Sequence, residues 1–156
     1  MLSKTSLYWC VSAVVFSIAL PLMAQQSRIY RDGNSWVEEI TGTMPLAREL
    51  HVLTDIGSVQ VQGNSQRVSY VVRKRSYATT EEIARRQFEQ LRISAVKIGD
   101  SDTIEGKANV RNLAHFGAEF IVQVPRDLSV VKVQTRGGSL AFNSIAATIS
   151  RMLTSN

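Results

Sequence analysis

The sequence predicts a mainly β domain that forms the start of a β-solenoid, with stacked short strands and one amphipathic helix at about residues 79–91. Three observations predict this fold class. Short runs of alternating apolar residues recur from Trp36 onward, as in strands with one buried face. Glycine, asparagine, aspartate and proline residues separate these runs and mark turns. A ten-residue pattern at 52–61 also recurs at 133–142, as stacked repeats would require.

Residues 1–24 precede this domain and have the three parts of a secretory signal. Lys4 and the amino terminus supply positive charge, residues 7–20 contain no charged side chain, and Ala24 offers a small residue for cleavage. We therefore expect a signal helix that is cleaved between Ala24 and Gln25. An uncleaved membrane anchor is the alternative, because the uncharged run at 7–24 is nearly as long as a membrane-spanning helix, which needs about 20 residues.

Both outcomes place the domain outside the cytoplasm, in the periplasm, the outer envelope or the medium. With the signal cleaved, no stable membrane span is expected. The one cysteine, Cys10, lies in the signal, so neither disulfides nor cysteine-ligated metals are expected in the mature chain. The net charge of +5 comes mainly from scattered arginines rather than a basic stripe, so nucleic acid is not an expected partner.

The chain of 156 residues is long enough for one domain with a sizeable core. Residues 25–35 are polar and are interpreted as a linker, residues 36–142 as the β-rich domain, and residues 143–156 as a tail of uncertain structure. Apolar alternation predicts strands at 36–41, 50–54, 59–61, 68–73, 92–98, 104–110, 120–124, 131–135 and 140–142, and a turn is expected at 99–102.

The single helix is predicted from its start signal and its apolar stripe. Thr79 and Glu82 have the spacing of a capping box, in which each side chain bonds the other residue's backbone amide. Ala84, Phe88 and Leu91 follow at helical spacing, so they can pack on a sheet.

The repeated pattern is read as a strand, a sharp corner and a second strand. The threonine suits a strand end, and the glycine allows a backbone conformation with positive φ. A chance likeness between two turns is the alternative interpretation. The turn residues of the two copies are Thr54, Gly57 and Ser58 in the first, and Thr135, Gly138 and Ser139 in the second.

Candidate catalytic or metal-binding residues are few. His51 and His115 lack a nearby ligand partner in the sequence, and Asp100, Asp102 and Glu105 form one acidic cluster. A solvated turn is the preferred interpretation of that cluster, with glycoside hydrolysis or calcium binding as the alternatives. No catalytic residue, metal or cofactor is predicted.

The order of these features resembles the bacterial "putative adhesin" family. An export signal is followed by the unit at 50–61, the helix at 79–91, a strand ending at Pro125 and the unit at 135–139. The resemblance covers about residues 36–142 and implies an exported β-solenoid whose molecular function is largely unassigned. Members of the family continue with glycine-rich repeats, and this chain departs from that pattern after Phe142. We therefore expect it to be a fragment that lacks later repeats.

The predicted function is that of a non-enzymatic, exported envelope protein, an adhesin-like structural or interaction module. Its partner is unidentified, with an envelope or extracellular polymer or protein as the expected class. A polysaccharide-acting solenoid enzyme and a membrane-tethered sensor or accessory domain are the alternatives.

Overall fold

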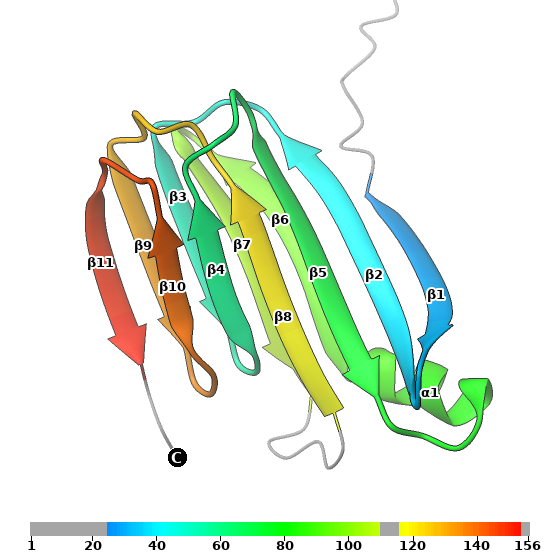
Figure 1. Cartoon of the computed structure of the whole chain (residues 1–156). Coiled ribbons are helices and arrows are strands. Elements are labelled where there is room, and N and C mark those ends of the chain that lie inside the picture. Colours follow the sequence, from blue (N-terminus) through cyan, green and yellow to red (C-terminus); the bar gives the residue numbers. More distant parts are fainter. Residues whose placement is uncertain (1–24, 110–115, 154–156) are drawn as a thin grey trace, which may run out of the picture.

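The computed structural model describes residues 25–109 and 116–153 as two mixed β-sheets that face each other, with one short helix at one end (Figure 1). The prediction of a mainly β fold is confirmed, but no β-solenoid is detected within these residues. The proposed signal helix and His115 lie outside the described residues. No helix among the described residues has the length and apolar character needed to cross a membrane.

The two sheets contain six and five strands. In spatial order the first consists of β1 (Gln26–Asp32), β2 (Ser35–Met44), β5 (Val68–Ser76), β8 (Phe116–Gln123), β4 (Ser58–Gln62) and β10 (Leu140–Asn143). The second consists of β11 (Thr148–Leu153), β9 (Val130–Thr135), β3 (Glu49–Thr54), β7 (Ser101–Ala108) and β6 (Leu91–Ile98).

The core lies between the sheets and is built from alternate residues of each strand, because successive side chains of a strand point to opposite faces. Phe120 of β8 is fully buried, and the missing side chain of Gly106 on β7 leaves room for its ring. The predicted core positions of β3, β4 and β5 all lie on this buried face: Leu50, Val52, Val59, Val61, Val68, Tyr70 and Val72.

The helix α1 (Glu81–Phe88) is shorter than the predicted 79–91. Thr80, not Thr79, is its N-cap, and the Thr80 hydroxyl accepts a hydrogen bond from the Ile83 amide at 3.4 Å. The third residue after this cap is Ile83, whose side chain cannot bond back, and Glu82 pairs with Arg86 one turn later, so the predicted capping box is wrong. Ala84 and Phe88 are buried as expected, but Leu91 is buried as the first residue of β6.

The segment interpreted as a linker instead contains the edge strand β1, which forms a hairpin with β2. Arg28 of β1 donates a hydrogen bond of 2.6 Å to Glu39 of β2, and Arg73 of β5 donates one of 2.9 Å to the same carboxylate. The hydrogen bond from Arg73 is the main cause of the lowered pKa of Glu39, although burial opposes it. Cross-strand ion pairs therefore attach β1 without the apolar alternation that would have predicted it.

Three strands of the second sheet, β3, β9 and β11, lie side by side and parallel. In the first sheet, β10 pairs in parallel with β4. Thr54 lies opposite Thr135 and Val59 opposite Leu140, so the two copies of the sequence pattern are adjacent and in register in both sheets. The tail expected to be of uncertain structure forms β11, a further layer beside β9.

Candidate functional site

The predicted turn residues form two corners that stack on one another. In the first, the Thr54 hydroxyl donates to the Ile56 carbonyl at 2.7 Å, and in the second the Thr135 hydroxyl lies 3.1 Å from the Gly137 carbonyl. Thr135 also reaches the Gly57 carbonyl of the other corner at 2.9 Å. These threonines therefore fix the shape of each corner and join the two layers.

The glycines of these corners have the positive φ that the sequence pattern suggested, +114° at Gly57 and +124° at Gly138. A Cβ added to Gly138 would lie 2.3 Å from the Gly57 carbonyl oxygen. Ser58 begins β4, and Ser139 accepts a hydrogen bond from the Val59 amide through its carbonyl. The corners thus have a structural role in joining strands of the two sheets. Of the predicted cleavage residues, Gln25 is exposed before β1, and Ala24 lies outside the described residues.

The acidic cluster of the sequence is dispersed by the fold. Asp100 is exposed in a turn and Glu105 is exposed on the outer face of β7, whereas Asp102 points into the core and is fully buried. The expected turn at 99–102 ends early, because β7 already begins at Ser101. The three carboxylates therefore do not surround one point where a sugar or a cation could bind. Within the described residues no group of three metal-ligating side chains occurs.

Asp102 has an unusual environment for a carboxyl group. Neither of its oxygens has a hydrogen-bond partner among the described residues. It lies opposite Leu50 on one side and Lys97 on the other, and the Lys97 ammonium donates to the Leu46 carbonyl. Burial raises the pKa of Asp102, and the charge of Lys97 opposes this in part.

We expect Asp102→Asn to stabilise the protein at pH 8 relative to wild type, and by less at pH 4. Folding raises the pKa of Asp102, so protonation of this carboxyl group stabilises the folded state. The stabilisation is fully present below the pKa of the unfolded chain and is lost as the pH rises through the pKa of the folded protein. Urea denaturation at both pH values measures the difference, with the exposed Asp100→Asn as control. A constant gap between Asp102→Asn and wild type across the pH range would contradict this assignment.

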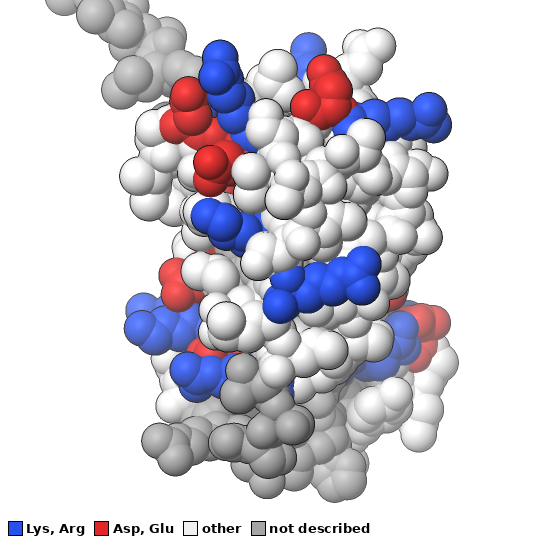
Figure 2. Space-filling model, turned by 90° about the vertical axis from the view of Figure 1, so that its left-hand side faces the viewer, with Lys and Arg blue, Asp and Glu red and all other residues white. Residues whose placement is uncertain are grey.

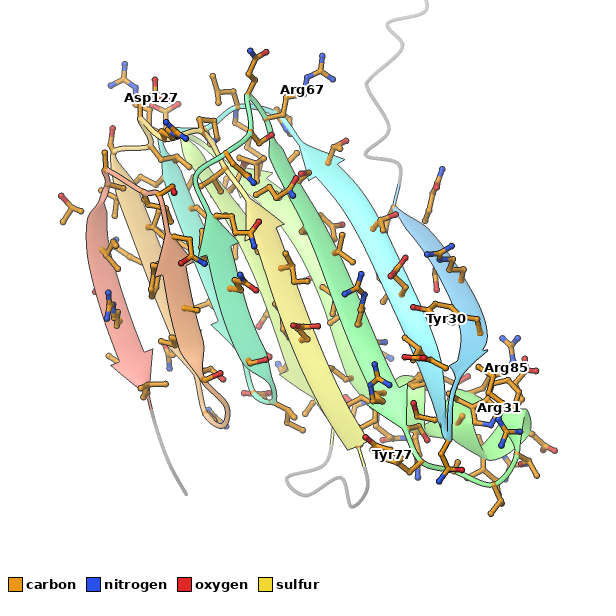
Figure 3. All side chains as sticks on the ribbon, in the orientation of Figure 1. Tyr30, Arg31, Arg67, Tyr77, Arg85 and Asp127 are labelled. Atoms are coloured by element: carbon orange, nitrogen blue, oxygen red, sulfur yellow. The ribbon has the colours of Figure 1, made fainter. Side chains whose placement is uncertain are left out.

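A groove of about 610 Å³ lies between β1, β6 and α1. The Lys74 ammonium on its floor is 2.7 Å from the Glu38 carboxylate and donates to the Phe88 carbonyl at 3.0 Å, at the carboxyl end of α1. Cations stabilise this end of a helix. Since these contacts already engage Lys74, the pair is best explained as the attachment of α1 to the sheets. Figure 3 shows Arg31, Tyr77 and Arg85 near α1, at the opposite end of the strands from Arg67 and Asp127.

His51 is the one predicted candidate histidine that the structure describes. It is half-buried on β3, and its Nε2 lies 3.2 Å from the Glu49 carboxylate of the same strand. Among the described residues, no third metal-ligating side chain joins His51 and Glu49 in a group that could hold a metal ion.

The opposite end of the two sheets, formed by β10 and β11, is the strongest candidate for an interaction site. Each of these strands is the last of its sheet and pairs on one side only among the described residues. Thr148 donates from its amide to the Ser129 carbonyl beside β9, so alternation directs the amides of Ile149, Arg151 and Leu153 toward the open edge. Backbone donors and acceptors at such an edge can pair with another strand.

Side chains at this β10/β11 end are only partly covered. Leu140, Phe142 and Ile149 are half-buried, whereas Met152 and Leu153 are 56% and 62% exposed. Figure 2 looks onto this end and shows mainly uncharged surface, with lysine and arginine side chains across its middle and acidic side chains toward its margins. The site therefore combines an open strand edge, apolar side chains and positive charge.

Sequence reasoning missed this site because β11 has no clear apolar alternation. Ile149 and Leu153 lie on its inward face, but Arg151 lies between them and interrupts the pattern. The signal that could have found it is the isoleucine, arginine and leucine at every second residue, an alternation with one charged member.

Comparison with known proteins gives one structural likeness. No protein-family model and no curated protein matches the sequence. A crystal structure of "a putative cell adhesion protein" from Clostridium sporogenes is similar with a TM-score of 0.47 and 10% sequence identity. The alignment covers 85% of this chain and 57% of that protein, so this chain spans little more than half of its length.

Proposed function

We propose that this chain is a non-enzymatic, exported module of the bacterial cell envelope, adhesin-like in kind, whose layers are the start of a β-solenoid. It interacts with other molecules by strand addition at the β10/β11 end. The observation that carries this proposal is the parallel, in-register layering of β3, β9 and β11 in one sheet and of β4 and β10 in the other. Each layer offers the next the same backbone pattern.

The stacked corners support the same proposal. The two corners bond to each other through the Thr135 hydroxyl and through the Gly57 amide, which donates to the Gly137 carbonyl at 2.8 Å. A layer of this kind buries little by itself and is stabilised by its neighbours. The outermost layer therefore has backbone groups and apolar side chains that a further strand can cover.

Export is tested by intact-mass analysis of the protein from a fractionated bacterial producer. We expect the protein in the extracytoplasmic fraction, with its amino terminus at Gln25. A protein that keeps residues 1–24 in the membrane fraction would instead support the membrane-tethered alternative, and a cytoplasmic protein would contradict export altogether.

Strand addition is tested by the attachment of producing cells to protein-coated and polysaccharide-coated surfaces. Ile149→Pro removes an amide that faces the open edge and leaves the amides that face β9, so proline is tolerated there but blocks pairing. We expect it to reduce attachment by about tenfold, as the loss of a backbone-paired interface predicts. The matched variant Ile149→Val keeps the amide and should attach like wild type. Equal attachment by both variants would contradict the proposal.

A further inference from the structure

The inward face of β11 differs from the two layers behind it at one position. Leu50, Val131 and Ile149 occupy one column across β3, β9 and β11, and all three are apolar. The next column contains Val52 and Val133, both buried, and then Arg151. Arg151 therefore stands at a position that is part of the hydrophobic core in both preceding layers.

The Arg151 guanidinium lies over the Phe142 ring of β10, 4.7 Å from its centre. The Arg151 side chain thus extends from β11 in the second sheet to β10 in the first sheet. Among the described residues no carboxylate lies within ion-pair distance of it, and its side chain is exposed. Cation–π contact holds the side chain in place but leaves guanidinium N–H groups open to a further partner.

This arrangement restricts what can cover the β10/β11 end. A wholly apolar strand would bury the Arg151 charge without a partner, which is strongly unfavourable. A second copy of this chain, paired through its own β11, would bring another arginine into the same layer. Inward-facing charges on edge strands prevent such indiscriminate pairing. A carboxylate facing the guanidinium removes the penalty and can bond to it through two parallel hydrogen bonds.

We propose that the partner at this end is an extended segment of another protein that pairs with β11 and places an aspartate or glutamate against Arg151. Apolar side chains two residues before and after that acid continue the columns of Ile149 and Leu153. The inference rests on the proposed function, since it specifies the chemistry of the strand that the same edge accepts. Arg151 then acts as the specificity-determining residue of the edge.

The probe is a synthetic peptide with the sequence of residues 146–153 carrying Arg151→Glu, compared with the same peptide carrying Arg151→Gln. Binding to the mature chain is measured by titration calorimetry up to about 1 mM peptide, the weak end of measurable affinity. We expect the glutamate peptide to bind about tenfold more tightly than the glutamine peptide. The protein variant Arg151→Glu should lose this preference and bind the unsubstituted peptide instead.

The outcomes separate this inference from the proposed function. If the wild-type chain binds both peptides equally and Ile149→Pro binds neither, the edge accepts strands but the acidic partner is wrong. If no peptide binds at any concentration tested, the inference is overturned. The milder Arg151→Gln variant of the protein tests whether a lost preference for the glutamate peptide is due to the charge and not to misfolding. Its amide NMR spectrum should match that of wild type. A retained preference for glutamate in that variant would also overturn the inference.

Discussion

Gly138→Ala is expected to lower the free energy of unfolding by about 3 kcal/mol, the upper range for one strained backbone position. Gly138 has a φ of +124°, which side chains resist, and an added Cβ would lie 2.3 Å from the Gly57 carbonyl oxygen. That oxygen belongs to the backbone of the neighbouring corner and cannot move independently of it. The substitution therefore strains its own residue and also separates the two stacked corners.

The adjacent Gly137→Ala is the matched control. A Cβ at this position meets nothing within 4 Å, and the residue has no positive φ. Urea denaturation should place Gly137→Ala within about 0.5 kcal/mol of wild type, as for other surface substitutions. Similar losses for both variants would show that the corners do not stack as described.

Phe120→Ala is expected to cost about 4 kcal/mol, within the range for removing a buried aromatic ring. Phe120 is fully buried on β8, and its ring occupies the space beside Gly106 of β7. The ring thus connects the middle of one sheet to the middle of the other. Its removal leaves a cavity that the strands, fixed by their ladders, cannot close.

Thermal and urea unfolding measure this loss, and Leu46→Ala is the control because Leu46 is 64% exposed. A second variant checks the contact itself. Gly106→Ala places a Cβ 2.5 Å from the end of the Phe120 ring, so it should destabilise wild type more than it destabilises Phe120→Leu. Additive effects in that double-mutant cycle would contradict the contact between Gly106 and Phe120.

The sequence predicted those strands whose two faces differ clearly. In β3, β4 and β5 an apolar residue stands at nearly every second position and lies on the buried face, whereas the opposite face is mostly polar and carries only Leu53 and Val71 as apolar residues. The apolar stripe predicts the helix, but Thr79 and Thr80 are chemically equivalent in the sequence, and in the structure it is the Thr80 hydroxyl that accepts from the Ile83 amide. The repeated pattern predicts two similar corners, and the structure places its two copies side by side in register.

The missed features depend on interactions between distant residues. β1 has polar residues on both faces and is attached through Arg28 and Glu39, which no local pattern reveals. Asp102 was expected in a solvated turn, but the extension of β7 to Ser101 places it in the core. The candidate site could not be predicted for a similar reason. Only the pairing of β11 with β9 places Arg151 beside Val133, at a position that is buried in the preceding layer.

Amide hydrogen exchange tests most directly our proposal that β11 offers an open strand edge to another chain. In the free protein, the Ser150 amide faces β9 and should exchange about 100-fold more slowly than those of Ile149 and Arg151, which face the open edge. Adding the glutamate peptide should protect Ile149 and Arg151 and leave Ser150 unchanged. Uniform protection along β11 in the free protein, or no new protection with bound peptide, would contradict the claim.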